Sequence, residues 1–276
     1  MRRAALSLLL VCVAGVCPAA TIELDRFVAS FVLTAYGTTV GRTEWRLVPT
    51  GERQFLWESR SETAGAGALI RDVYVTERSE SELHENAFRP LRYNYDRQAG
   101  NANRSVQVAF DWRDNVVENT AEGHTWRMQV PPGTLDKLNY LLALMGDLAL
   151  GRRDMRYTIA DGGKLKIYEM RAAGTEVLET ALGRLDTLKV RRLRDAEYGE
   201  ATLWCAPALG YLPVKLENRD RDGRLVSMYI ESIEGPPPAV VAPAGGAAAQ
   251  PRARRASRAS GESTSSSTPS SSTGTS

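Results

Sequence analysis

Apolar and polar residues alternate along most of the chain. In FVASFVLTAY, residues 27–36, every second residue from Phe27 to Ala35 is apolar, which places these side chains on one face of an extended strand. The same alternation recurs in EWRLV, QFLWES, RDVYVTER, RSVQVAFDW, HTWRMQV, KLKIYEM, TLKVRRL and RLVSMYIESI. A period of two residues is typical of strands that bury one face and expose the other. The pattern therefore predicts a protein built mainly from half-buried β-strands.

Short turn sequences separate the predicted strands. They are rich in glycine, proline, aspartate and asparagine, which favour tight turns. Examples are PTG at 49–51, RDN at 113–115, AEG at 121–123, DGG at 161–163, AAG at 172–174 and DRDG at 220–223. Connections this short join antiparallel neighbours, whereas parallel strands need long crossovers. The expected fold is therefore mainly β, a strongly curved antiparallel meander or partly closed barrel.

One segment, residues 131–151, departs from the two-residue period. Its sequence, PPGTLDKLNYLLALMGDLALG, repeats apolar residues at helical spacing and predicts one covering α-helix over about 134–150. Thr134 is the expected N-cap, Asp136 suits the positive end of the helix dipole, and Gly151 is the expected stop. The predicted apolar stripe consists of Leu138, Leu141, Leu142, Met145, Leu148 and Ala149. A single apolar helix among the predicted strands is expected to plug or cover one face of the curved sheet.

The stretch WCAPALGYLPVKLENRDRDG, residues 204–223, combines an aromatic strand with two prolines and a glycine. A strand is expected to end at Ala206-Pro207, and the chain is expected to resume as a strand from Tyr211 after a short break. Pro213 lacks the N–H that a strand donates, so it is expected at an edge, at a bulge or as the first paired residue of a strand. The stretch therefore predicts a corner in the sheet.

The N-terminus has the pattern of a secretory signal peptide over residues 1–20. Two arginines precede an apolar run at 4–16, and small residues follow near the expected cleavage site after Ala19 or Ala20. The run is shorter than the roughly twenty apolar residues that span a bilayer, so no transmembrane segment is expected after cleavage. Acylation of Cys17 as a lipoprotein is the alternative, but Val16 fits poorly where a small residue is expected. The sequence predicts an exported, periplasmic protein of a Gram-negative bacterium.

The composition changes after Glu234. Residues 235–276 are rich in proline and alanine, then arginine, then serine and threonine, and a segment with so little apolar surface is expected to be disordered. The expected organisation is a signal peptide at 1–20, a single antiparallel β domain at 21–234 and a disordered tail at 235–276. The tail contains Arg252, Arg254, Arg255 and Arg258. Weak contact with an anionic envelope surface is one expectation for them, and a solubilising tail without a specific role is the other.

The charge distribution excludes one class of partner. The chain carries 35 basic and 33 acidic residues, for a net charge of +2. Arg2, Arg3, the four tail arginines and Glu262 lie outside the expected domain, which leaves 29 basic and 32 acidic residues and a net charge of −3. Because the basic character lies in the tail, no nucleic-acid-binding domain is expected.

Three residues are candidates for catalysis. Cys205 is the single cysteine left after removal of the signal peptide, and its neighbours Trp204 and Ala206 cannot activate a thiol, so burial is expected. His84 and His124 lie in SELHENAF and AEGHTW, without a second ligand at a metal-binding spacing. An envelope hydrolase that uses His84 or His124 as a base stays open as an alternative. No catalytic residue is assigned. No metal is expected, because of the histidine spacing, and no nucleotide cofactor is expected, because the glycine-containing segments have no phosphate-binding pattern.

Aromatic residues are the other candidates for a site. In strands they usually pack in the core or across strands, but Asp111-Trp112 and Tyr93-Asn94-Tyr95 are also suited to line a sugar or lipid site. The candidate ligand-binding residues are Tyr36, Trp112, Trp204 and Tyr211.

The order of these segments resembles an exported bacterial family catalogued as domain of unknown function 3108. The similarity runs through most of the chain from Phe27 to Ile233. It includes Tyr36-Gly37 with Gly41, Arg89-Pro90, Phe110-Asp111-Trp112, Pro131-Pro132-Gly133 before Asp136, ETALGRLDTLKVRRL at 179–193 and the stretch at 204–223. Cys205 departs from the family pattern, in which an ordinary apolar residue is usual. The resemblance implies an exported, mostly antiparallel β-protein without an assigned enzyme activity, similar in shape to periplasmic lipoprotein carriers, although fold does not establish function.

Three hypotheses of function follow. The leading one is a non-catalytic periplasmic protein whose curved sheet and helix enclose an apolar groove that binds a lipid, an acyl chain or an envelope polymer. The alternatives are the envelope hydrolase and a purely structural interaction module with a solid interior and an exposed edge strand.

Overall fold

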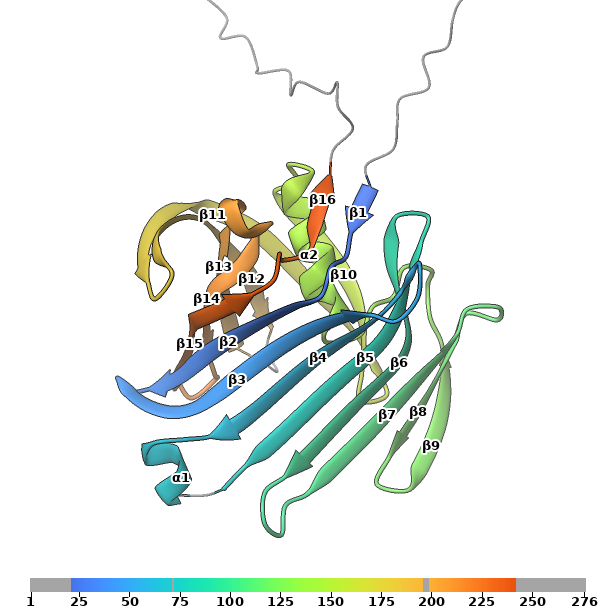
Figure 1. Ribbon diagram of the computed structural model, residues 1–276. Coiled ribbons are helices and arrows are strands. Elements are labelled where there is room, and N and C mark those ends of the chain that lie inside the picture. Colours follow the sequence, from blue (N-terminus) through green and yellow to red (C-terminus); the bar gives the residue numbers. More distant parts are fainter. Residues whose placement is uncertain (1–20, 71, 196–198, 242–276) are drawn as a thin grey trace, which may run out of the picture. The chain divides into compact units, whose positions relative to one another are not determined.

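The structure, a computed structural model, describes residues 21–70, 72–195 and 199–241 (Figure 1). The predicted signal peptide, with Cys17, and the four tail arginines lie outside the described residues. The elements before the main helix are β1 (Thr21–Glu23), β2 (Phe27–Ala35), β3 (Thr38–Pro49), β4 (Gln54–Thr63), α1 (Ala66–Ile70), β5 (Tyr74–His84), β6 (Ala87–Gln98), β7 (Arg104–Asp111), β8 (Val116–Ala121) and β9 (His124–Gln129). The main helix α2 (Asn139–Ala149) is followed by β10 (Asp154–Asp161), β11 (Lys164–Thr180), β12 (Gly183–Asp195), β13 (Gly199–Ala206), the 3-10 helix η1 (Pro207–Leu209), β14 (Leu212–Arg219), β15 (Leu225–Glu234) and β16 (Ala239–Val241).

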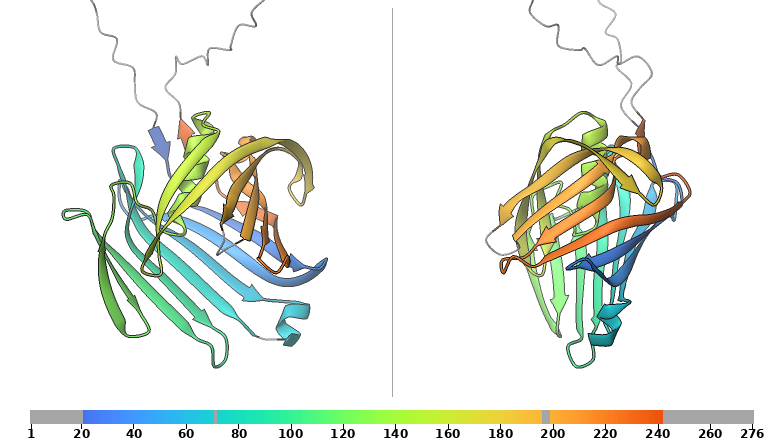
Figure 2. Two further views of the ribbon diagram at one scale, coloured as in Figure 1. Left: turned by 180° about the vertical axis from the view of Figure 1, so that it is seen from behind. Right: turned by 90° about the vertical axis from the view of Figure 1, so that its left-hand side faces the viewer.

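Fourteen of the strands form one antiparallel sheet, in the order β10-β11-β12-β13-β14-β15-β2-β3-β4-β5-β6-β7-β8-β9. The chain builds this sheet from two meanders, β2 to β9 and β10 to β15, which are joined where β15 pairs with β2. The sheet is not closed, because β9 and β10 form its two edges. Figures 1 and 2 show the sheet curving around α2, and we call the face directed at α2 the inner face. The predicted curved antiparallel meander is confirmed.

The two-residue alternation separates the inner face from the outer face. On β2, Phe27, Ala29 and Phe31 are fully buried. The ring of Phe31 packs on Trp45 with centroids 4.6 Å apart, and Phe27 packs on Trp57 at 5.6 Å. These side chains and those of α2 form one apolar core. Burial of apolar surface therefore holds the described part of the chain together, which contains one free cysteine.

Helix α2 begins later than the predicted start near Thr134, which is not its N-cap. Leu135 instead pairs with the edge of β10, where it donates its N–H to Thr158 O and accepts from Ala160 N, both at 2.8 Å. This extended pairing holds the chain outside the helical conformation before residue 139. The predicted start is wrong because a contact with a distant strand overrides the local pattern.

The Asp136 carboxylate caps the start of α2 in place of the predicted threonine. Its Oδ1 accepts the main-chain N–H of Leu138 at 2.8 Å and that of Asn139 at 2.7 Å. The predicted stripe is buried except for Ala149, which is exposed, and the helix also buries Leu144. Gly151 follows the last turn with a φ of +82°, so the predicted stop is confirmed.

The predicted corner at 204–223 is confirmed. Strand β13 ends at Ala206, η1 breaks the chain, and Gly210 and Tyr211 then adopt left-handed conformations with φ of 61° and 63°. Pro213 pairs with Cys205 where the register between β13 and β14 shifts, so the proline lies beside a bulge.

Two elements were not expected from the sequence. Strand β16 lies beyond the predicted end of the domain at Glu234 and pairs with β1. It also packs on the helix, since a Cβ built on Gly146 would lie 3.3 Å from Val240 Cγ2. Helix α1 is too short to show a helical period in the sequence. Among the described residues, no helix is long and apolar enough to cross a membrane.

Candidate functional site

Charged and aromatic side chains gather on the inner face beside the start of α2, and we call them the inner polar cluster. They are Glu77 of β5, Tyr93 and Tyr95 of β6, Lys137 before α2, Asp161 of β10, Lys166 and Tyr168 of β11, and Arg192 of β12. Strand registers place the members that lie on strands on the inner face, because they lie an even number of residues from buried neighbours such as Ser79, Met170 and Val190. The cluster therefore draws on both halves of the sheet.

Lys137 faces both halves of the sheet. Its Nζ lies 3.7 Å from Glu77 Oε1 and 5.3 Å from the centroid of the Tyr95 ring, and the Tyr93 hydroxyl donates to the same Glu77 oxygen. Burial acts to lower the pKa of Lys137, but the carboxylates of Glu77 and Asp161 outweigh it and raise this pKa above its ordinary value. The Lys137 side chain is 33% exposed, so a ligand in solution can reach it.

The second half of the cluster is built on β10, β11 and β12. Lys166 Nζ lies 2.5 Å from Asp161 Oδ2 across the hairpin. The Arg192 guanidinium lies 4.8 Å above the Tyr168 ring, which meets Tyr140 of α2 edge-on at 5.1 Å. Arg192 Nε is buried without a hydrogen-bond partner, and in the described part of the chain no carboxylate pairs with this side chain. The cluster thus contains a cation that is stacked but not neutralised.

A fully buried hydrogen-bond network positions the cluster. Ser79 Oγ donates to Asp136 Oδ2 at 2.5 Å, and Asn139 Nδ2 donates to Ser81 Oγ at 2.5 Å. Burial raises the pKa of Asp136 to about 6, although the hydrogen bonds that it accepts act in the opposite direction. Because Lys137 directly follows Asp136, the network anchors its main chain to β5.

The unpaired Arg192 in the cluster favours an anionic ligand group. Lys137 and Lys166 lie beside the carboxylates of Glu77 and Asp161, and the buried Asp136 adds a third carboxylate, but among the described residues no carboxylate pairs with Arg192. Partly buried charges are costly to keep, and ionisable groups with perturbed pKa values gather at functional sites. The cluster is therefore the strongest candidate for a binding site on the inner face.

An apolar strip, defined as Leu33, Leu216 and Val226, lies on the same inner face as the cluster, with β13 and β14 between Val226 and Arg192. Leu216 and Leu33 lie on either side of Met228 and both pair with it. Val226 lies two residues before Met228, in the neighbouring row of cross-strand pairs, and this row also contains Arg192. Leu33 and Leu216 are half-buried, and Val226 is 42% exposed. The inner face therefore combines charged groups with accessible apolar side chains, as the binding of an amphiphile requires.

Two of the predicted aromatic residues lie close to Glu176. Trp204 is buried on the outer face of β13, where its Nε1 donates to Glu176 Oε2 at 2.8 Å. Lys215 and Lys189 cover its ring at 4.1 and 5.0 Å. Tyr211 is half-buried and lines a groove together with Glu176. Trp204 is thus enclosed by its neighbours, whereas Tyr211 is accessible to a ligand.

The other two predicted aromatic residues lie in turns. Tyr36, between β2 and β3, is 82% exposed. Trp112, between β7 and β8, stacks on Phe110 with centroids 5.4 Å apart and donates from Nε1 to Pro90 O at 2.6 Å. Neither residue belongs to the inner polar cluster. The structure therefore does not bring the four predicted residues into one site.

The candidates for catalysis lie apart from one another. Cys205 is fully buried, and burial raises the pKa of its thiol well above the ordinary value, so the expected packing role is confirmed. His84 and His124 are exposed beside the β5–β6 and β8–β9 turns, which lie at opposite ends of the sheet because turns alternate along a meander. The His84 ring lies 4.0 Å from Glu85, itself highly exposed. Among the described residues, no group of three or more His, Cys, Asp and Glu side chains could hold a metal ion.

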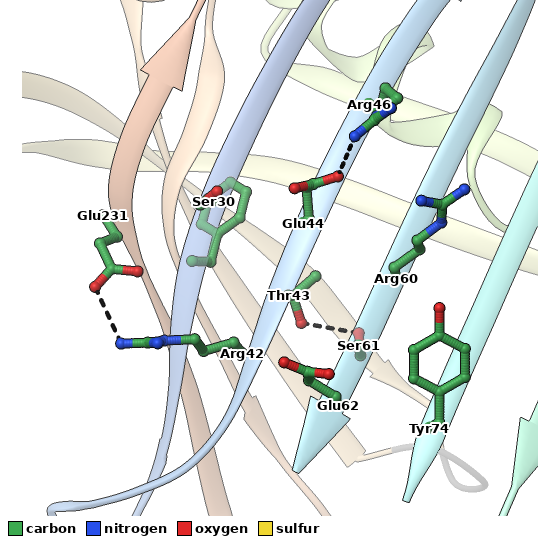
Figure 3. Close-up of a pocket in the computed structure, with 11 residues that line it drawn as sticks. Ser30, Arg42, Thr43, Glu44, Arg46, Arg60, Ser61, Glu62, Tyr74 and Glu231 are labelled. Atoms are coloured by element: carbon green, nitrogen blue, oxygen red, sulfur yellow. Dashed lines mark hydrogen bonds and ion pairs between the residues drawn. The ribbon is translucent and has the colours of Figure 1, made fainter. Parts of the chain in front are cut away.

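The outer face carries a separate polar groove of about 470 Å³ on β15, β2, β3, β4 and β5 (Figure 3). Arg42 reaches across the strands to Glu231 at 3.5 Å, and Arg46 reaches Glu44 at 2.9 Å. These ion pairs are partly exposed and contribute little to stability. Because its arginines pair with glutamates on the same surface, we interpret this groove as a solvated charged face.

The residues of the inner polar cluster carry one signal in the sequence. In KLKIYEM, Lys166 lies two residues from Tyr168, and in TLKVRRL, Arg192 lies two residues from Val190, so each cation points to the same side of its strand as that neighbour. A basic residue at a position where the two-residue alternation calls for an apolar one indicates a cation on the buried side of a strand. The sequence does not predict that these strands face β5 and β6, so the cluster itself was missed.

Comparison with known proteins identifies the family of the chain. A family model described as protein of unknown function DUF3108 matches residues 28–231. The chain belongs to the DUF3108 family. The match runs from β2 into β15 and so includes every member of the inner polar cluster. The resemblance stated from the sequence is confirmed, and the description of DUF3108 assigns no activity.

Solved structures are similar to this DUF3108 protein at low sequence identity. A β-barrel-like protein of domain of unknown function DUF1849 from Brucella abortus aligns with a TM-score of 0.51 and 8% identity, over 77% of this chain and 98% of its own. A Bacteroides fragilis protein described as exported and with a YmcC-like fold aligns with a TM-score of 0.34 and 13% identity, over 79% of this chain and 100% of its own. The first similarity supports the fold alone, and the second is too weak to carry an argument. No curated protein matches the chain.

Proposed function

We propose that the protein is a non-catalytic binding protein of the cell envelope that holds a lipid, an acyl chain or an envelope polymer on its inner face. The inner polar cluster takes a charged group of the ligand, and the apolar strip takes neighbouring hydrocarbon. The observation that carries this proposal is Arg192, a stacked cation with a buried, unpartnered Nε, which shares the neighbour Tyr168 with the partly exposed Lys137. Export to the periplasm is part of the proposal and is supported by the signal-peptide pattern of the sequence.

The bound group is expected to be anionic. A guanidinium offers several N–H donors in a plane that matches a carboxylate or a phosphate. Lys137 adds a flexible ammonium, and the hydroxyl of Tyr95 adds a donor on the same side of the sheet. An anionic group here would lie among Lys137, from the chain before α2, and Lys166 and Arg192, from β11 and β12.

The ligand is expected beside α2 rather than beneath it. The leading hypothesis from the sequence placed an apolar groove between sheet and helix, but α2 fills this region with buried side chains. They are Leu141, Leu142, Leu144, Met145 and Leu148. The solvent-accessible part of the inner face that remains is polar at the cluster and apolar at Leu33, Leu216 and Val226. We therefore propose that the ligand binds to a surface with one polar and one apolar part.

Native mass spectrometry of the mature protein from its own host tests the proposal. The wild-type protein is expected to carry an anionic lipid or polymer, which lipid extraction and glycan analysis then identify. Arg192→Gln should carry less of it, while Arg191→Gln, on the exposed outer face of the same strand, should carry as much as the wild type. Repeated recovery of the wild-type protein without any bound ligand would contradict the proposal.

A structural interaction module is the second candidate, and the free edge of β9 favours it. Within the described residues β9 pairs with β8 alone, so the main-chain groups on its other side can accept a further strand. Photo-crosslinking from Thr125, on this strand, distinguishes the two candidates. Capture of one protein partner, with no ligand in the mass spectrum, would favour the interaction module.

Among the described residues, the structure shows no site for the hydrolase alternative. It needs a histidine and a carboxylate in an open cleft. His84 and His124 instead lie on separate exposed turns. We therefore do not propose hydrolysis.

A further inference from the structure

A second groove lies near the other end of α2, and the proposed function does not use it. Its volume is about 350 Å³, and it lies between the β11–β12 hairpin, Arg153 after α2, and the corner at η1. Its apolar lining comes from Val177, Leu188, Pro207 and Tyr211. Two segments that the sequence singled out, 179–193 and 204–223, therefore meet at this groove.

Strand register places the groove on a continuation of the inner face. Leu188 belongs to the apolar core and pairs with Thr175, and Asp186 pairs with Val177. Residues two apart on a strand point to the same side, so these four side chains share one face of the hairpin. Val177 is 46% exposed there, which leaves apolar surface open to a ligand.

Tyr211 is held in a strained conformation beside the groove. Its φ of 63° lies in the left-handed region, which residues other than glycine, asparagine and aspartate rarely adopt. Its N–H donates to Ala206 O at 2.8 Å and closes the corner. Strain of this kind gathers at ligand sites, where the fold maintains it for function. Tyr36, Glu85 and Glu122 adopt similar conformations in other turns, so the conformation of Tyr211 supports the groove by fixing the ring at its edge.

The groove offers one unpaired charge of each sign. Arg153 donates through Nη1 to two main-chain carbonyls at the end of α2, at 2.9 and 3.4 Å, but in the ranges that the structure describes no carboxylate pairs with it. Asp186 is exposed and likewise has no ion-pair partner there. Glu176 differs from both, because Lys189 lies 2.7 Å from its carboxylate. A ligand with an anionic and a cationic group would therefore match Arg153 and Asp186.

We propose that this groove binds a zwitterionic group attached to an apolar chain. The anionic part pairs with Arg153, the ammonium pairs with Asp186, and the chain lies along Val177 and Tyr211. A phospholipid of the ethanolamine type and a soluble phosphoethanolamine share this chemistry. The inference does not depend on the proposed function, whose cations lie at the other end of α2.

Calorimetric titration of the full mature chain with lysophosphatidylethanolamine, below its micelle concentration, tests the inference. Arg153→Gln and Asp186→Asn are each expected to weaken binding by about tenfold, the loss of one charge-assisted hydrogen bond. Arg184→Gln is the matched control, since Arg184 is exposed on the same hairpin and does not line the groove. It should bind as the wild type does.

Titrations with two further ligands test the role of the ammonium and of the acyl chain separately. Lysophosphatidylglycerol lacks the ammonium, so Asp186→Asn should not weaken its binding. Phosphoethanolamine without an acyl chain should bind more weakly than the lipid, and equal binding would contradict a contact of the apolar chain with Val177 and Tyr211. The inference is overturned if the wild type does not bind either zwitterion, or if Asp186→Asn binds the lipid as tightly as the wild type. Arg192→Gln affects only the inner polar cluster, so weaker binding of lysophosphatidylethanolamine by Arg153→Gln but not by Arg192→Gln assigns the binding to this groove, whatever the outcome for the proposed function.

Discussion

Replacement of Asp136 by asparagine is expected to change how the stability of the fold depends on pH. The Asp136 side chain is fully buried and accepts hydrogen bonds from two main-chain N–H groups at the start of α2 and from Ser79 Oγ. An asparagine keeps a carbonyl oxygen for the main-chain groups, and its amide can donate to the Ser79 hydroxyl. The substitution therefore removes the charge and retains the cap.

The magnitude follows from the pKa of this carboxyl group. Burial raises the pKa of Asp136 from 3.8 to about 6, so the folded state binds the proton more tightly than the unfolded chain does. The stability that this proton contributes is complete below the unfolded pKa and is lost as the pH rises through the folded pKa. About two pKa units correspond to about 3 kcal/mol. Between about pH 4 and about pH 6, the free energy of unfolding should fall by up to this amount in the wild type through Asp136 alone.

Urea unfolding of the mature chain, followed by tryptophan fluorescence at several pH values in this range, measures the effect. Asp136→Asn should lose most of the fall in unfolding free energy. Asp154→Asn is the control, because Asp154 is exposed and pairs with Arg171 at the surface, and it should behave as the wild type does. If Asp136→Asn keeps the wild-type dependence on pH, the argument from buried charge is refuted.

Three further predictions concern packing, thiol chemistry and the tail. Leu142→Ala removes a side chain that is 1% exposed and should lower the unfolding free energy by about 2–5 kcal/mol in urea titrations, whereas a loss below about 1 kcal/mol would contradict a filled inner face. Cys205 should react with a thiol reagent only after unfolding, and rapid reaction of the folded protein would contradict its burial. The full chain should bind anionic vesicles weakly at low salt, and a chain ending at Val241 should not, since it keeps β16 but lacks the four arginines. Equal sedimentation of both chains, or binding indifferent to salt, would exclude an electrostatic role for the tail.

The strands could be predicted because their signal is local. The alternation from Phe27 to Ala35 reflects one buried and one exposed face, and each strand carries this information within its own residues. The corner at Pro213 could be predicted for the same reason, since a missing N–H acts at its own position. The start of α2 could not, because the main chain of Leu135 is hydrogen-bonded to Thr158 and Ala160, which belong to another element. The local helical pattern does not decide the conformation here, because a strand distant in the sequence supplies the hydrogen bonds.

The inner polar cluster could not be predicted for a related reason. Glu77 and Arg192 lie on strands far apart in the sequence, and only the curvature of the sheet directs both at the start of α2. The sequence drew attention to aromatic residues instead, and Tyr36 and Trp112 proved to lie in turns. Tyr211 does line a groove, because the corner that positions it is local.

Two neighbouring arginines provide the most direct test of the proposed binding site on the inner face. Arg192 faces the inner polar cluster, and Arg191, the residue before it, is exposed on the outer face. The mature chain and each arginine-to-glutamine variant are titrated with lysophosphatidylglycerol in a calorimeter. The account predicts that Arg191→Gln binds as the wild type does and that Arg192→Gln binds roughly tenfold more weakly. Equal affinities for all three proteins, or equal weakening by both substitutions, would contradict it.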